Sequence, residues 1–150
     1  VMKNLRLTDS FRIAVKGLQK AFSREYHIRV AFFLVLALFL YSLVLGLTLR
    51  EWLVLVAFSS LVVCFEMMNS ALERLADAVH PEWSEQVGFA KDLAAGAVLI
   101  SIGAAAAAGL PVYVLAFSRR FSVPWTYSLF INLGLLIFGI VLLLVWDSRR

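Results

Sequence analysis

The chain has 150 residues, 62% of them apolar, and its mean hydropathy is strongly positive. This composition excludes a soluble domain of the same length and is typical of a membrane protein. The formal net charge is +4 at pH 7, and the basic residues are unevenly distributed along the chain. The single cysteine, Cys64, lies in an apolar run and leaves no partner for a disulfide bond within the chain.

The first predicted element is a helix over residues 8–25, TDSFRIAVKGLQKAFSRE. Apolar residues recur there at spacings of three and four, and basic residues recur every four positions. The basic residues are Arg12, Lys16, Lys20 and Arg24. We expect a basic amphipathic helix lying flat on the anionic cytoplasmic surface of a membrane, although an ordinary soluble helix has the same pattern.

Three windows are long and apolar enough to cross a bilayer core of about 30 Å, which takes about 20 helical residues. They are residues 30–49, 93–117 and 125–146. A fourth window, 52–78, is uninterrupted only as far as Phe65 and then carries acidic residues. The sequence therefore predicts an all-α integral membrane protein of one domain over residues 1–150, with one surface helix and four transmembrane helices.

The basic residues also predict the orientation. With a cytoplasmic N-terminus and four spans, the cytoplasmic side would hold Lys3, Arg6, Arg12, Lys16, Lys20, Arg24, Arg29, Arg74, Lys91, Arg149 and Arg150. Only Arg50, Arg119 and Arg120 would lie on the opposite side. This asymmetry favours cytoplasmic N- and C-termini, although two arginines in one short outer loop argue mildly against it. We expect no cleavable signal peptide, because a long basic segment precedes the first apolar stretch.

An acidic stripe marks the second span. At about 100° per residue, Glu66, Glu73 and Asp77 fall within about 40° of one another around a helix. Asn69 and Ser70 flank them. A charged residue at the bilayer centre costs at least about 2.5–3.5 kcal/mol, so such residues face partners or water and are usually functional. The alternative is that the helix has already reached the cytoplasmic interface and the stripe is merely solvated.

The residue types in and near this stripe suit phosphoryl transfer. Carboxylates from different helices bind Mg²⁺ together with substrate phosphates, and a desolvated glutamate can act as a general base on an alcohol. Lys91 opens the next helix and could hold a phosphate. The sequence contains neither GxxxxGK[ST] nor the glycine-rich loop of protein kinases. His27 and His80 lack a metal-ligand spacing and are interpreted as polar interface residues.

A specific resemblance follows from these residues. The segment EMMNSALE at 66–73, then Asp77, Gly88, AKD at 90–92 and AVLI at 97–100, resembles the signature of small prokaryotic membrane lipid kinases, the diacylglycerol kinase and undecaprenol kinase family. The resemblance extends upstream to KGL at 16–18, Glu25 and Arg29, and covers roughly residues 11–117. It implies a surface helix, three transmembrane helices and a homotrimer with active sites shared between subunits. The span at 125–146 is a departure from that pattern.

The resemblance also implies an ATP-dependent enzyme and a role for each catalytic or metal-binding residue. Glu66 would be the general base on the lipid hydroxyl, and Asn69 would orient the reacting groups. Glu25 and Glu73 would bind the Mg²⁺ that bridges the ATP phosphates.

Four further residues would contact the nucleotide. Lys91 would contact the γ-phosphate, and Asp92 would position the lysine or the nucleotide. Asp77 belongs to the same stripe and is a further nucleotide-site candidate. Trp83 stands where the family offers an aromatic ring to adenine. An alternative interpretation, equally consistent with the sequence, is a tryptophan that lies at the membrane interface.

The run AKDLAAGAVLI, residues 90–100, is closer to undecaprenol kinases than to diacylglycerol kinases. We therefore expect undecaprenol as the substrate, with diacylglycerol as the alternative, at the bacterial inner membrane and with the active site on the cytoplasmic side. No nucleic-acid partner is expected. A hypothesis of a different class is a non-catalytic membrane subunit or an ion or proton pathway in which the acids relay charge. Asn69 and the Lys91-Asp92 pair favour the kinase, because a relay needs neither.

Overall fold

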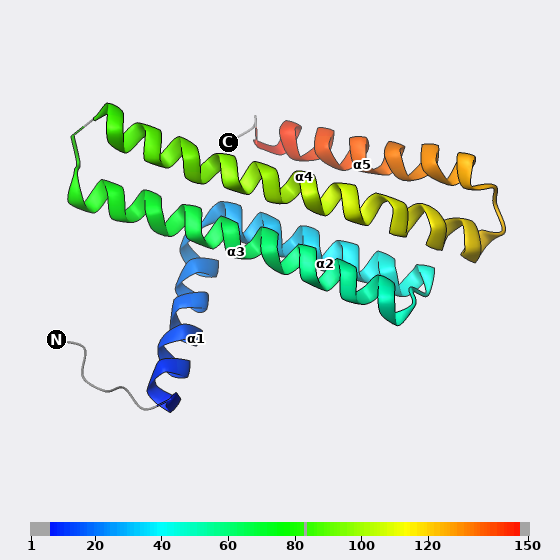
Figure 1. Ribbon diagram of the computed structural model, residues 1–150, viewed down its shortest axis with the longest axis horizontal. Helices are drawn as coiled ribbons and strands as arrows, with labels where there is room; N and C mark the ends of the chain where they lie inside the picture. Colours follow the sequence, from blue (N-terminus) through cyan, green and yellow to red (C-terminus); the bar gives the residue numbers. More distant parts are fainter. Residues whose placement is uncertain (1–6, 83, 148–150) are drawn as a thin grey trace. The chain divides into compact units, whose positions relative to one another are not determined.

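The chain is all-helical in the computed structural model, which describes residues 7–82 and 84–147. The helices are α1 (Leu7–Arg24), α2 (Tyr26–Leu45), α3 (Leu49–Val79), α4 (Glu85–Phe121) and α5 (Trp125–Asp147) (Figure 1). Helices α2 to α5 are each long and apolar enough to cross a membrane. The predicted all-α integral membrane fold, with an amphipathic first helix and a fourth span, is therefore confirmed. Lys3, Arg6, Arg149 and Arg150, used to predict the orientation, lie outside the described residues.

The helices divide into two compact units. Unit 1 comprises Val1–Ala37 and Ser59–Ile102, and unit 2 comprises Leu38–Phe58 and Gly103–Arg150, as far as these ranges are described. Helix α1 belongs to unit 1 and α5 to unit 2, whereas α2, α3 and α4 each contribute a part to both. Each unit is described separately below.

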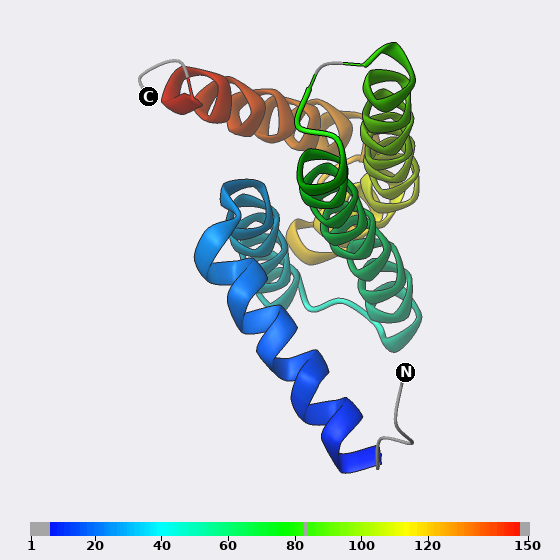
Figure 2. The same ribbon diagram turned by 90° about the vertical axis from the view of Figure 1, so that its left-hand side faces the viewer.

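Unit 1 begins with two helices separated by one residue, Glu25. Figure 2 shows that the chain turns at this point, so that α1 and α2 run in different directions. The ring of Phe22 on α1 packs edge-on against Phe32 on α2, with ring centroids 5.3 Å apart. Helix α1 has no buried residue, and its large apolar side chains Leu7, Phe11, Ile13, Leu18 and Phe22 are exposed. An uncovered apolar face beside a row of cations is what an interfacial helix requires.

In unit 2, two helices are each followed by a residue with a left-handed backbone conformation. Gly46, with φ of 65°, follows α2, and Ser122, with φ of 54°, follows α4. The Leu47 N–H donates to the Ser42 carbonyl and the Val123 N–H to the Ser118 carbonyl, a bond that closes the last turn of each helix. The first span was predicted to run to residue 49, which is wrong at this end, because Gly46 stops the helix at Leu45.

Buried polar contacts hold α5 to its neighbours in unit 2. The Ser128 hydroxyl on α5 donates to the Val114 carbonyl on α4 at 2.7 Å. The Tyr41 hydroxyl on α2 donates to the Asn132 amide oxygen on α5 at 3.3 Å, and the Tyr41 ring stacks on Tyr113 with centroids 5.4 Å apart. Polar groups in hydrocarbon need such internal partners, because no water is present to replace them.

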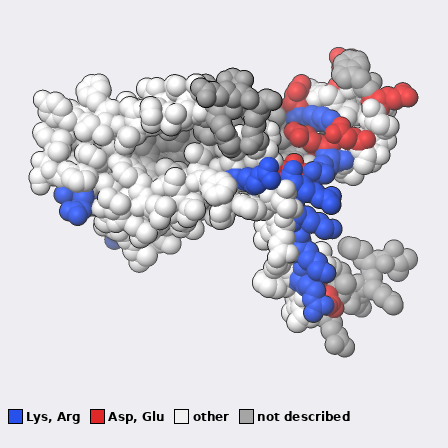
Figure 3. All heavy atoms as spheres, turned by 180° about the vertical axis from the view of Figure 1, so that it is seen from behind, with Lys and Arg blue, Asp and Glu red and all other residues white. Residues whose placement is uncertain are grey.

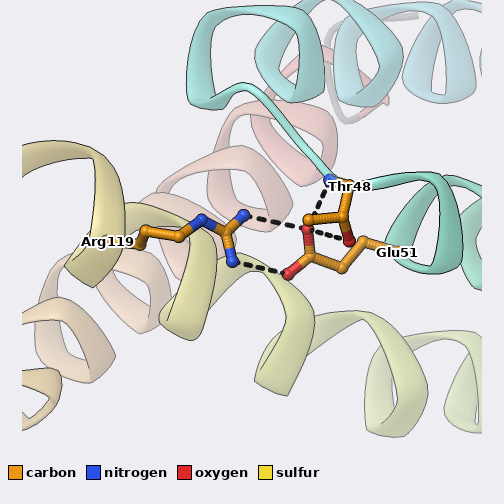
Figure 4. A network of polar contacts seen from close by, with 3 residues as sticks. All are labelled: Thr48, Glu51 and Arg119. Carbon is orange, nitrogen blue, oxygen red and sulfur yellow. Dashed lines mark hydrogen bonds and ion pairs between the residues drawn. The ribbon is translucent and has the colours of Figure 1, made fainter.

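Glu51 joins the start of α3 to the end of α4, also in unit 2. Its carboxylate accepts the Thr48 backbone N–H at 2.6 Å and the Thr48 hydroxyl at 2.9 Å, so the Glu51 side chain caps the start of α3 with one of the two bonds of a capping box. Arg119 donates two further hydrogen bonds to the same carboxylate, at 2.9 and 3.1 Å (Figure 4). Arg119, one of the two arginines that argued against the predicted orientation, is therefore neutralised locally.

Candidate active site

The acidic stripe lies on α3 within unit 1. The Asn69 side-chain amide donates to a Glu73 carboxylate oxygen at 2.8 Å, one helical turn further along the chain. The Asn69 side-chain oxygen is buried and has no hydrogen-bond partner among the described residues. Buried acceptors are almost always satisfied in folded proteins, so this oxygen is an acceptor open to a water molecule or to a group from another molecule.

Glu66 stands one turn earlier on the same helix and is partly buried. Its carboxylate interacts electrostatically with Glu73 on its own helix and with His27 at the start of α2. Glu66 forms no ion pair with an arginine or lysine among the described residues. A carboxylate without a bound cation retains a lone pair for accepting a proton from a substrate hydroxyl.

Glu25, at the junction of α1 and α2, is paired with a residue that the sequence did not indicate. The Nε of Arg74 on α3 donates to a Glu25 carboxylate oxygen. The side chain of Glu25 is 21% exposed, whereas that of Arg74 is 57% exposed. The structure thus places Glu25 against a cation from the helix that carries Glu73, the residue expected to share its metal ion.

Lys91 of α4 is paired with Asp77 rather than with its sequence neighbour Asp92. The Lys91 ammonium donates to an Asp77 carboxylate oxygen, and this ion pair links α4 to the end of α3. Asp77 is therefore the acid that contacts the lysine in this structure, whereas the sequence analysis had Asp92 positioning either the lysine or the nucleotide. Trp83, the candidate adenine-binding residue, lies outside the described residues.

The space-filling view shows how these charges gather. In Figure 3, basic side chains run along α1, and acidic and basic side chains lie together where α3 ends and α4 begins. No group of three or more His, Cys, Asp or Glu side chains within residues 7–82 and 84–147 could hold a metal ion by itself. Magnesium ions in nucleotide sites need only one or two carboxylates, because phosphate oxygens and water complete the coordination.

Sequence reasoning missed two residues at this site, Arg74 and His27. Arg74 was assigned only to the cytoplasmic charge balance, although its position directly after Glu73 was a signal of proximity to the stripe. His27, which interacts with Glu66, was interpreted as an interface residue because its spacing matched no metal site. Arg74 is distant in sequence from Glu25, and His27 is distant in sequence from Glu66. The spacing of residues along the chain therefore could not identify these two contacts.

The fold and the site define a multi-pass helical membrane protein that carries carboxylates, an amide and cations at the ends of its spans. Residues 12–113 match the family model described as prokaryotic diacylglycerol kinase. Because this match covers more than half of the chain, the chain belongs to the prokaryotic diacylglycerol kinase family. The resemblance in the sequence is thereby confirmed, and with it the class of enzyme, an ATP-dependent lipid kinase.

Two relatives agree with this assignment. The chain is 32% identical over 96 residues to a diacylglycerol kinase of Haemophilus influenzae, covering 64% of this chain and 81% of that protein. It is 37% identical over 104 residues to a diacylglycerol kinase of Synechocystis sp., covering 69% of this chain and 59% of that protein. The family match ends before α5, so the fourth span lies outside the part that defines the family.

Proposed function

We propose that the chain transfers the γ-phosphoryl group of ATP to the primary hydroxyl of a membrane lipid, in a site built by unit 1. The hydroxyl oxygen attacks the γ-phosphorus, its proton passes to Glu66, and the bond from phosphorus to the oxygen that links it to the β-phosphate breaks. ADP leaves with that oxygen. The observation that carries this proposal is the Asn69 oxygen, buried and without a partner, between two acids on one face of α3.

Each remaining residue has a role in this proposal. Asn69 accepts a hydrogen bond from the reacting hydroxyl or orients it beside Glu66. Lys91 binds the γ-phosphate, with Asp77 and Asp92 positioning the lysine or the nucleotide. For Trp83, which lies outside the described residues, the family resemblance supports a role beside the adenine.

Glu25 and Glu73 are the residues that would hold Mg²⁺. Carboxylate oxygens are the ligands that Mg²⁺ prefers, and two of them with substrate phosphates match its usual coordination in nucleotide sites. When bound, Mg²⁺ would neutralise charge that develops on the phosphate oxygens. Glu73 is held in place by the Asn69 amide, which leaves its other oxygen available to the cation.

Diacylglycerol is the substrate that the comparisons favour, because both relatives carry that name. Undecaprenol is the second candidate, favoured by the run AKDLAAGAVLI at residues 90–100. Each is a long apolar molecule with one primary hydroxyl at the interface, so hydropathy does not separate them.

The same proposal includes an assembly and an orientation. We infer a homotrimer in the bacterial inner membrane, with the N-terminus and the active site in the cytoplasm. The basic residues of α1 support this orientation, because the cytoplasmic leaflet is anionic. Chemical cross-linking of the purified protein in bilayers would test the trimer, with a ladder that stops at three subunits as the expected result.

The decisive experiment supplies purified protein in bilayers with labelled ATP, Mg²⁺ and one lipid at a time. Transfer of label to diacylglycerol supports the first candidate, and transfer to undecaprenol alone supports the second. The complete absence of ATP consumption that depends on lipid and Mg²⁺ would instead favour a non-catalytic membrane subunit or an ion or proton pathway.

A further inference from the structure

Arg74 contacts a proposed metal ligand and has no role in the scheme above. It follows Glu73 directly on α3, and it lies about 60° around the helix from Asp77. Its Nε donates to Glu25, and no other hydrogen bond or ion pair of its guanidinium is seen among the described residues. With its side chain 57% exposed, Arg74 can reach a molecule that arrives from water.

The pairing opposes metal binding at Glu25. Arg74 occupies one carboxylate oxygen of Glu25, and a divalent cation at the other oxygen would lie beside the guanidinium, where the two positive charges repel each other. If Glu25 is a metal ligand, binding of Mg²⁺ therefore favours the exchange of Arg74 for the ion. The exchange releases a guanidinium beside Glu73, where ATP phosphates would lie.

The charges of the nucleotide define what a released guanidinium would bind. ATP with one Mg²⁺ still carries a net charge of about −2, and Lys91 supplies one positive charge near it. A guanidinium is well suited to phosphate, because its planar array of N–H groups can donate two parallel hydrogen bonds. Arg74 has these groups, since only its Nε is used by Glu25.

We propose that Arg74 is a phosphate-binding residue of the nucleotide site, held by Glu25 until Mg²⁺ and the nucleotide bind. This inference rests on the proposed function, because it requires Glu25 to bind Mg²⁺ and unit 1 to bind ATP. Before the nucleotide arrives, Arg74 competes with the cation for Glu25. Once the nucleotide is bound, Arg74 donates to its phosphate oxygens, so metal and nucleotide bind cooperatively.

The test compares the full-length protein with Arg74→Gln and Arg74→Lys in detergent. Two binding measurements are made without turnover: Mn²⁺ by electron paramagnetic resonance in the absence of nucleotide, and a fluorescent, non-hydrolysable ATP analogue with Mg²⁺. Arg74→Gln should bind Mn²⁺ about two- to fivefold more tightly, because an ion pair with an exposed partner competes only this strongly. It should bind the analogue about tenfold or more weakly, because a charged hydrogen bond to phosphate is lost.

Two variants serve as comparisons. Arg50→Gln removes one exposed positive charge that forms no described ion pair, and should leave both affinities close to wild type. Arg74→Lys keeps the charge but not the planar array, so it should bind Mn²⁺ as wild type does and still bind the analogue more weakly. If Arg74→Gln does not fold, Arg74→Lys alone tests whether Arg74 binds the nucleotide phosphates.

Some results would overturn the inference. If Arg74→Gln and Arg50→Gln give the same two affinities, Arg74 only ties α3 to the junction of α1 and α2. In Arg74→Gln, a change in Mn²⁺ affinity without a change in nucleotide affinity, or the reverse, also overturns it, because the exchange requires both. In Arg74→Lys, an affinity for the analogue equal to that of the wild type overturns it. The proposed function is judged separately, on the wild type: it fails if the wild type neither binds the analogue nor consumes ATP when lipid is added.

Discussion

Glu66 stands where the apolar run of α3 gives way to the acidic stripe, partly buried and without a paired cation among the described residues. We expect Glu66→Gln to lower turnover by about 10²–10⁴-fold, because the amide keeps the size of the side chain but cannot take a proton. Lipid-dependent release of ADP measures the effect. The yield and assembly of the variant should match wild type, and activity above about a tenth of wild type would exclude Glu66 as the general base.

Glu25 and Glu73 come from different elements of unit 1 and would meet only around a cation. We expect Glu25→Gln and Glu73→Gln each to raise the Mg²⁺ concentration needed for half-maximal activity more than they raise the KM for lipid. Titration of Mg²⁺ at fixed ATP measures the first quantity, and titration of lipid measures the second. Unchanged metal dependence in both variants would remove the two glutamates from the metal site.

At the residue scale, the sequence located the stripe but not its contacts. Glu66, Glu73 and Asp77 were predicted to share one face with Asn69 beside it, and the hydrogen bond from Asn69 to Glu73 agrees with that spacing. The Arg74 contact with Glu25 could not be predicted, because 49 residues separate the two and their approach depends on how α1 and α2 meet α3. Periodicity reports neighbours within a helix, not between helices.

At the element scale, hydropathy located every span but misplaced several ends. The window 93–117 is the centre of α4, which is longer at both ends because polar residues of the membrane interface continue the helix. The end of α2 is set by Gly46 and the start of α3 by Thr48 and Glu51, which are local signals that hydropathy does not include. The sequence TLRE at 48–51 has the pattern of a capping box, which the sequence analysis had overlooked.

Glu51 gives a test at the same scale. We expect Glu51→Ala to destabilise the protein by about 1–2 kcal/mol, because it removes a helix cap and a bidentate ion pair whose arginine is about half exposed. Thermal unfolding in detergent should show a lower Tm, while the turnover of the folded variant stays near wild type, since unit 1 holds the proposed site. Arg50→Ala is the matched control, because Arg50 is an exposed neighbour with no described ion pair. An equal Tm for both variants would mean that the contacts in Figure 4 contribute little.

At the scale of the whole molecule, the family match and the fold have different extents. Residues 12–113 carry the family pattern, and α5 follows it. Helix α5 is nevertheless part of a compact unit with segments of α2, α3 and α4, and its Ser128 and Asn132 are buried there. The sequence predicted the fourth span but could not predict its partners, because Ser128 and Asn132 lie in an apolar run with no pattern of their own.

We expect deletion of everything after Phe121 to preserve measurable kinase activity and to lower stability. Every proposed site residue precedes Ile102, and the described contacts of α5 with other helices lie in unit 2. Deletion leaves the Tyr41 hydroxyl without its acceptor and removes the Ser128 hydrogen bond to Val114, each worth about 0.6–2 kcal/mol in a membrane. Lipid-dependent ATP turnover and Tm, both measured in detergent, separate the two effects.

Asn132→Leu in the full-length chain is the matched control for this deletion, because it breaks the contact with Tyr41 while α5 remains. We expect its Tm to fall between those of the wild type and the truncated protein, with turnover near wild type. A truncated protein that is folded and assembled yet inactive, beside an active Asn132→Leu, would mean that α5 completes the active assembly. It would then act through its apolar surface, by closing a path for the lipid or by forming part of a subunit interface, and not through its polar contact with α2.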